Sequence, residues 1–162
     1  MEKRTFAMIK PDAVACHYTG QIITLIEKAG FRIIAQKMLR LTTSDTNKFY
    51  AVHSQRPFFR NLSLFMTSGP VVVMVLEKEN AIAEFRTLIG NTDPQAAPTG
   101  SIRKIFGQSK TRNAIHGSDS DENALREIHF FFSEREIVPE PYRLPIPEAC
   151  LLYTSDAADD LI

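Results

Sequence analysis

The segment at 113–119, with sequence NAIHGSD, places a histidine between an apolar pair and a polar turn. Imidazole is a nucleophile at neutral pH without prior deprotonation, because its unperturbed pKa is about 6.5. Basic side chains precede this segment at Lys104, Lys110 and Arg112. Among such cations His116 could attack a phosphoryl group and hold it covalently. The alternative for an isolated string of this kind is a polar turn residue without chemistry.

The residues after His116 are expected to shape a rigid turn. Gly117 permits a backbone geometry that other residues resist, and Ser118 and Asp119 can form local hydrogen bonds. We therefore expect the imidazole to be presented from a turn.

The overall composition limits the partners of the chain. A chain of 162 residues fits one domain, and 19 basic and 19 acidic residues cancel. The absence of net charge predicts no nucleic-acid or membrane partner, so any anion site must be a local cluster. Cys16 and Cys150 give neither a disulfide framework nor a zinc spacing, and the first residues do not resemble a signal sequence. These features predict a cytoplasmic protein.

Hydrophobic periodicity and chain-breaking residues predict alternating strands and helices. Strands are expected at 5–9, 31–41, 71–76 and 127–132; the third is apolar on both faces and is expected to be central. Helices are expected at 20–28, from a Ser44 cap to about 54, and at 58–66, 80–89 and 122–126. Lys10-Pro11-Asp12 is expected to form a turn, residues 91–112 a long loop, and Ser133 with Glu136 a capping box. This βαββαβ order predicts an α+β, ferredoxin-like fold, with helices packed on a four-stranded antiparallel sheet.

The end of the chain differs in character from the rest. We predict one domain at 1–138 and an extended, proline-rich segment at 139–149. Residues 150–162 resemble the translated sequence of a transposase adapter used in shotgun DNA library preparation. The hypothesis is a non-native tail; codons that do not spell the adapter would remove it and leave a genuine tail.

Five separated blocks together resemble the nucleoside diphosphate kinase family. They are IKPD at 9–12, RPFF at 56–59, SGPVV at 68–72, GSIR at 100–103 and RNAIHGSD at 112–119. Their order and spacing match the family over about residues 4–138. The resemblance implies transfer of the γ-phosphate of a nucleoside triphosphate, usually ATP, to a nucleoside diphosphate by a ping-pong mechanism.

The resemblance also implies the catalytic residues. His116 would be the nucleophile that becomes phosphohistidine. Glu127, on the last expected strand, would orient its ring, with Ser118 and Tyr50 close by.

Nucleotide-binding residues follow from the same resemblance. Lys10, Arg86, Thr92 and Arg103 would bind phosphates, and Lys10 with Asn113 would hold the ribose hydroxyls. Phe58 would stack on the base, and this contact would accept any base because every base has a flat face.

The family implies Mg²⁺ on the terminal phosphates, held mostly by water and substrate oxygens, with Asp119 touching it through water. It also implies a homo-oligomer built from dimers, either a tetramer or a hexamer. Judged singly, Tyr50, Thr92 and Glu127 are more typical of packing, turn and ion-pair residues.

The chain departs from the family pattern at four places. Cys16-His17 replaces a basic residue and glycine, Thr99-Gly100 replaces Pro-Gly, Lys104-Ile105 replaces Gly-Asp, and Lys110 replaces an apolar residue beside the base. The departures at Thr99, Lys104, Ile105 and Lys110 motivate a second hypothesis, a nucleotide-binding regulatory protein with little turnover. A third is a phosphohistidine donor to other proteins.

Overall fold

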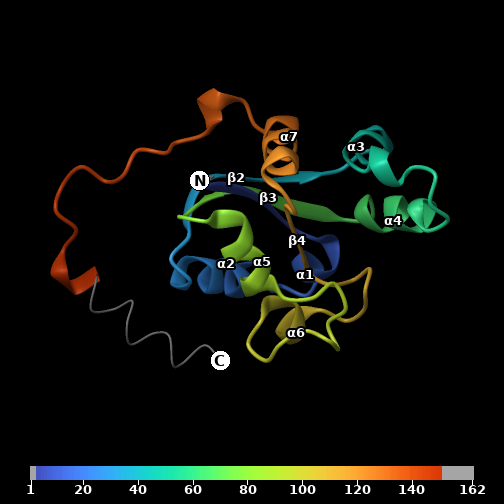
Figure 1. Ribbon diagram of the computed structural model, residues 1–162, viewed down its shortest axis with the longest axis horizontal. Coiled ribbons are helices and arrows are strands. Elements are labelled where there is room, and N and C mark those ends of the chain that lie inside the picture. Colours follow the sequence, from blue (N-terminus) through green and yellow to red (C-terminus); the bar gives the residue numbers. More distant parts are fainter. Residues whose placement is uncertain (1–2, 151–162) are drawn as a thin grey trace.

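A four-stranded antiparallel sheet forms the centre of the computed structural model, which describes residues 3–150 (Figure 1). The strands are β1 (Arg4–Ile9), β2 (Arg32–Arg40), β3 (Pro70–Glu77) and β4 (Ile115–Gly117), in the spatial order β2-β3-β1-β4. β3 is internal and buried from Val71 to Leu76, as its apolar character on both faces predicted. The predicted fold class is confirmed.

Seven α-helices and two 3₁₀ helices surround this sheet within the described residues. The α-helices are α1 (Pro11–Ala15), α2 (Thr19–Lys28), α3 (Thr43–Phe49), α4 (Phe59–Met66), α5 (Ala81–Ile89), α6 (Ile102–Phe106) and α7 (Asp121–Phe131). The 3₁₀ helices are η1 (Ala51–His53) and η2 (Glu134–Glu136).

Helices cover both faces of the sheet and create two hydrophobic cores (Figure 1). Because neighbouring strand residues point to opposite faces, β1 supplies Ala7 and Ile9 to one core and Phe6 and Met8 to the other. The first core packs against α2 and α5, and the second against α3 and α7. The site described below lies where β1 and β4 emerge between these layers.

The predicted strand at 127–132 is wrong, because α7 is one continuous helix from Asp121 to Phe131. Its buried face consists of Ala124, Glu127 and Ile128, which follow helical spacing. The Ser120 side chain caps the helix by accepting from the backbone N–H of Asn123. The aromatic run at 130–132 is typical of strands and masked this periodicity. The fourth strand is instead β4, which carries His116.

Three other local predictions are corrected by the structure. Lys10-Pro11-Asp12 leads into α1, because a proline at the first helical position is compatible with a helix start. The cap of α3 is Thr42 rather than Ser44, and Thr42 forms a reciprocal capping box with Asp45. The loop expected at 91–112 contains α6, whose cap is Ser101. The capping box of residues 133 and 136 is confirmed at the start of η2.

Gly117 is needed for space rather than for an unusual backbone geometry. A Cβ atom there would lie 2.8 Å from the ring of Phe85, whereas the positive φ of this segment belongs to Ala114, at 75°. His116 lies on β4, paired with Met8 of β1, and not on a turn. A second departure from common geometry is His17, with a φ of 64°.

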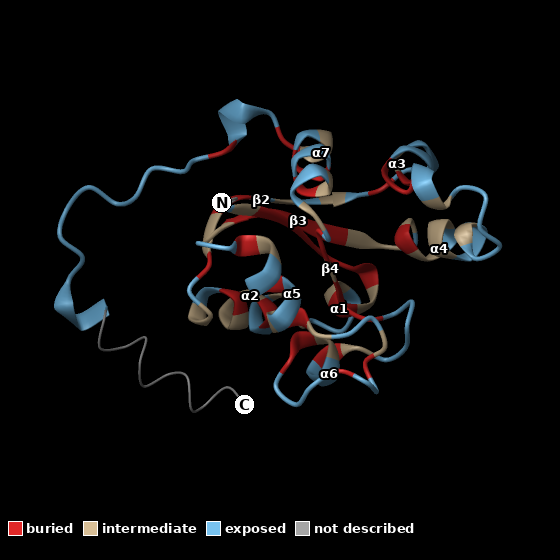
Figure 2. Cartoon of the chain, viewed as in Figure 1, coloured by how far each residue is buried: buried red, intermediate tan, exposed pale blue. Residues whose placement is uncertain are grey.

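Residues 139–150 are exposed and lack regular structure except for a helical turn at 148–150 (Figure 2). The backbone N–H of Val138 donates to the carbonyl of Ile34 on the outer strand β2, at 2.8 Å. Of the tail predicted at 150–162, Cys150 is exposed, and residues 151–162 lie outside the described residues. Within residues 3–150, no helix is long and apolar enough to cross a membrane.

Candidate active site

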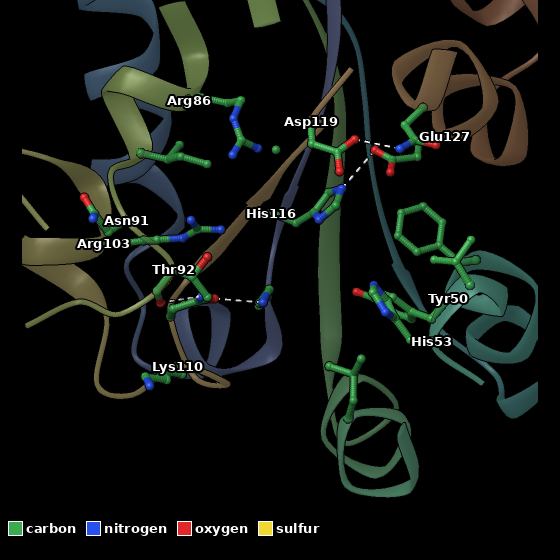
Figure 3. A pocket seen from close by; sticks show the side chains of 18 of the residues that line it. Tyr50, His53, Arg86, Asn91, Thr92, Arg103, Lys110, His116, Asp119 and Glu127 are labelled. Atoms are coloured by element: carbon green, nitrogen blue, oxygen red, sulfur yellow. Dashed lines mark hydrogen bonds and ion pairs between the residues drawn. The ribbon is translucent and has the colours of Figure 1, made fainter. Parts of the chain in front are cut away.

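A cavity of about 410 Å³ opens between α5, α7, the α3–α4 region and the end of β4. Every predicted site residue except Ser118 lines it, although these residues come from positions 10 to 127 of the chain. His116 lies between a group of basic side chains and a second wall that contains Glu127 and Tyr50 (Figure 3).

A carboxylate holds one edge of the His116 imidazole. Nε2 of His116 lies 2.9 Å from Oε1 of Glu127, and the Ser118 hydroxyl donates to the same oxygen at 2.8 Å. Ser118 also accepts from the backbone N–H of Phe6 at 3.2 Å, which anchors it to β1. Because a carboxylate accepts hydrogen bonds, the Nε2–H tautomer is favoured, which leaves the lone pair on Nδ1.

Aromatic rings restrict the imidazole from the side. Phe49 meets it edge-on, with ring centroids 5.5 Å apart, and Phe6 lies 5.9 Å away. Both rings belong to the core beneath the cavity. The imidazole is therefore fixed both by hydrogen bonding and by packing.

Lys10 is buried at the end of β1. Its Nζ donates to Oδ1 of Asn113 at 2.7 Å, and Nδ2 of Asn113 donates to the Thr92 carbonyl at 3.0 Å. Burial, reinforced by the charge of Arg103, lowers the pKa of Lys10 to about 8, although Asp12 opposes this shift. These bonds join three distant segments on one wall of the cavity.

Arg103 reaches the cavity from α6. Its guanidinium donates to the carbonyl of Ile115 through Nη2 at 2.8 Å and to the carbonyl of Gly90 through Nη1 at 3.0 Å. Burial, followed by the charge of Arg86, lowers the pKa of Arg103 to about 10. Packing two guanidinium groups and a buried lysine around one space favours an anionic ligand.

Tyr50 and Phe58 lie on the wall formed by the α3–α4 region. The Tyr50 hydroxyl is buried and has no hydrogen-bond partner among the described residues. Burial, with the nearby charge of Glu127, raises the pKa of Tyr50. Phe58 is half-exposed, and its ring centroid lies 5.7 Å from that of His53. The wall offers an unpartnered polar atom and a flat aromatic face.

Asp119 is an exposed residue whose carboxylate lines the cavity. Its Oδ1 accepts from Nδ2 of Asn123 at 2.6 Å, and this hydrogen bond lowers the pKa of Asp119. Residues 3–150 contain no cluster of three or more acidic, histidine or cysteine side chains that could hold a metal ion by itself. A single ionised carboxylate suits a cation held mainly by water and ligand phosphates.

Comparison with known proteins identifies the family. The sequence model described as nucleoside diphosphate kinase matches residues 3–137. The chain belongs to the nucleoside diphosphate kinase family.

Curated nucleoside diphosphate kinases resemble the chain along almost their whole length. The protein of Prosthecochloris aestuarii is 56% identical over 136 residues, which cover 84% of this chain and 96% of that protein. The protein of Maricaulis maris is also 56% identical, over 84% of this chain and 97% of its own.

Solved nucleoside diphosphate kinase structures share the fold. The Aquifex aeolicus enzyme superposes with a TM-score of 0.82 at 48% identity, covering 84% of this chain and 99% of that chain. The Halobacterium salinarum enzyme, solved in complex with CDP, gives a TM-score of 0.84 at 39% identity, covering 88% and 95% of the two chains.

The cavity of this nucleoside diphosphate kinase family member also includes residues of α7 that the sequence did not single out. Asn123 and Arg126 line the cavity from α7. Their signal was helical spacing: Asn123 lies three residues before Arg126 and four before Glu127, and the incorrect assignment of a strand hid this pattern. Of the departures from the family pattern, Lys110 lines the cavity, whereas Lys104 donates to the Gln95 carbonyl at 3.3 Å.

His17 shows why one departure matters for the backbone. It stands where the family commonly has glycine, and its φ of 64° lies in the left-handed region that favours glycine. The turn between α1 and α2 keeps that conformation despite the side chain. His17 is exposed.

Proposed function

We propose that the protein transfers the γ-phosphate of a nucleoside triphosphate, usually ATP, to a nucleoside diphosphate through phosphohistidine at His116. The observation that carries this proposal is the asymmetry of the imidazole. Nε2 is bonded to Glu127, while the ring lies in a cavity that Lys10, Arg86 and Arg103 also line.

The reaction consists of two balanced transfers. The Nδ1 lone pair of His116 attacks the γ-phosphorus, an N–P bond forms, and the bond to the bridging oxygen breaks, releasing a nucleoside diphosphate. The imidazole then carries positive charge, which the Glu127 carboxylate stabilises through Nε2–H. A terminal oxygen of the second diphosphate attacks the phosphorus, and the N–P bond electrons return to Nδ1.

Charge neutralisation is the main contribution of the surrounding residues. Lys10, Arg86 and Arg103 would bind the phosphates, with Thr92 at the same wall. The Tyr50 hydroxyl lacks a partner among the described residues, and an oxygen of the phosphoryl group on Nδ1 could supply one. An orphaned polar atom of this kind fits a site built to receive an oxygen-rich ligand.

The nucleoside would lie toward the α3–α4 wall. Phe58 is half-exposed and would stack on the base, a contact that tolerates every base because all have a flat face. Lys10 and Asn113, already joined to each other, would hold the ribose hydroxyls. The CDP bound in the Halobacterium relative supports a nucleotide as the ligand class.

Mg²⁺ fits this site as a companion of the substrate. Asp119 would hold it through water, in keeping with an ionised carboxylate at the cavity and the small number of protein ligands. When bound, the ion supplies neutralisation of charge on the terminal phosphates.

We extend the proposal to assembly and location. β2 is an edge strand that pairs only with β3 in this sheet, and its Met38 is 60% exposed. Such an edge supports a homo-oligomer built from dimers.

The free, exposed cysteines at 16 and 150 and the zero net charge suit a cytoplasmic protein without nucleic-acid or membrane partners.

The deciding experiment is exchange of label between nucleotides. Purified protein incubated with Mg²⁺, γ-labelled ATP and GDP should form labelled GTP, and His116→Ala should form none while retaining its circular dichroism spectrum. The phosphorylated protein should gain the mass of one phosphate and lose it on addition of GDP. Turnover in His116→Ala equal to that of the wild type would exclude the proposed nucleophile. Nucleotide binding without exchange would support the regulatory hypothesis. Transfer of the label to another protein, but not to GDP, would support the hypothesis of a phosphohistidine donor to other proteins.

A further inference from the structure

Arg126 reaches two of the groups that hold the imidazole. Its Nη2 lies 3.7 Å from Oε2 of Glu127, the carboxylate oxygen that does not bond His116. Its Nη1 donates to the Phe49 carbonyl at 3.4 Å, and its guanidinium carbon lies 5.7 Å from the centre of the Phe49 ring. One planar group therefore contacts both the carboxylate and the aromatic residue that flank His116.

We propose that Arg126 is a positioning residue that holds Glu127 and Phe49 against the His116 imidazole. This inference rests on the proposed function. The two oxygens of Glu127 have separate tasks: Oε1 accepts from Ser118 and bonds His116, while Oε2 lies against the guanidinium. With a restraint at each oxygen, the carboxylate cannot turn about its terminal bond without losing a contact.

The hydrogen bond from Arg126 to the Phe49 carbonyl holds the end of α3. Phe49 is the last residue of α3, and a cation near the final carbonyls of a helix is favourable. The Phe49 ring also meets the imidazole edge-on at 5.5 Å. Arg126 thereby links α7, which carries Glu127, to α3, which supplies the packing wall.

The side chain of Arg126 is 42% exposed, so its charge is partly hydrated and its effect depends mainly on geometry. Arginine suits this task better than lysine, because a planar guanidinium can contact two acceptors and stack on a ring together. Arg126→Lys should therefore retain part of the effect, and Arg126→Gln should lose it.

The test combines single-turnover kinetics with nitrogen NMR. Arg126→Gln should slow phosphorylation of His116 by ATP about tenfold while the KM for ATP stays within about twofold, with Arg126→Lys intermediate. In protein labelled with ¹⁵N-histidine, the His116 signal, assigned by its loss in His116→Ala, should shift from the Nε2–H tautomer toward a mixture. Arg135→Gln, an exposed arginine just beyond α7, is the matched control and should change neither measurement.

Each result decides the inference. A raised KM with an unchanged rate in Arg126→Gln would show a phosphate-binding role instead and overturn it. An unchanged rate, or a slower rate with an unchanged His116 tautomer, would also overturn it. If the wild type itself forms no phosphohistidine, the proposed function fails, and the tautomer measurement still reports on Arg126 alone.

Discussion

Lys10 and Asn113 are 103 positions apart in the sequence, and a 2.7 Å hydrogen bond joins their side chains inside the cavity. Lys10 follows β1 and Asn113 precedes β4, two strands that pair with each other. The pairing of these strands therefore brings two distant parts of the site together. It also leaves a buried ammonium group beside Arg103, with the Asn113 amide as its bonded partner.

Nucleotide binding should weaken above pH 8. Burial and Arg103 lower the pKa of Lys10 to about 8, so in the free protein this lysine is about half deprotonated at pH 8 and loses most of its remaining proton occupancy as the pH rises further. Phosphate favours the protonated form and must restore that proton, which makes binding less favourable at high pH. The dissociation constant of ADP, measured by calorimetry, should be constant from pH 6.5 to 7.5 and rise by up to about tenfold per pH unit above 8.

Calorimetry in buffers of different ionisation enthalpy provides the control for this prediction. At pH 8.5 the wild type should take up a proton on binding ADP, and Lys10→Met should lose that uptake. Equal proton uptake by the two proteins would show that another group titrates.

Glu127→Gln should slow formation of phosphohistidine without weakening nucleotide binding. The amide oxygen can still accept from Nε2–H, but the negative charge that stabilises the imidazolium is lost. We expect the rate of phosphorylation by ATP to fall about 100-fold, with the dissociation constant of ADP unchanged within about twofold. Quenched-flow kinetics of the phosphorylated protein checks the rate.

Glu122→Gln is the matched control, because Glu122 is an exposed residue of the same helix that does not line the cavity. It should leave both quantities unchanged. A Glu127→Gln protein with the wild-type rate would remove the carboxylate from the proposed mechanism.

Local pattern predicted those elements whose own sequence carries a strong signal. β1 and β3 are continuous apolar runs, and α5 ends at Gly90 as its sequence indicates. α6 has only five residues, and its place depends on burial of Ile102 and Phe106 and on the hydrogen bonds of Arg103. These are tertiary contacts, which no periodicity in a single segment records.

The site residues were predicted from the family resemblance, and their contacts became visible only in the structure. Glu127 was expected on a strand, but it contacts His116 from α7, and the same helix brings Arg126 to the cavity. Ser118 was expected close to His116, and its hydroxyl donates to the Glu127 oxygen that also bonds His116. Residue types predicted the chemistry, while side-chain direction required the three-dimensional structure.

His17→Gly should stabilise the protein. His17 has a φ of 64°, and a side chain in the left-handed region costs about 1 kcal/mol relative to glycine, partly offset by the greater freedom of glycine in the unfolded chain. We expect the free energy of unfolding in urea to rise by roughly 0.5 kcal/mol. Ala15→Gly, at an exposed helical position two residues earlier, is the control and should lower it by up to about 1 kcal/mol. A loss of stability in His17→Gly would show that the imidazole makes a compensating contact.

Gly117→Ala should destabilise the protein and disturb β4, the strand that carries His116. The added Cβ would lie 2.8 Å from one ring carbon of Phe85 and 3.1 Å from Cδ1 of Ile89, both core residues of α5. Because the core is close-packed, either α5 or β4 must move, at a cost of about 1–3 kcal/mol in the free energy of unfolding. Gly20→Ala is the matched control: nothing lies within 4 Å of its added Cβ, and its position in α2 favours alanine by up to about 1 kcal/mol. Urea unfolding should therefore shift in opposite directions for the two variants. Since Gly117 follows His116 directly, Gly117→Ala should also slow its phosphorylation, whereas Gly20→Ala should not.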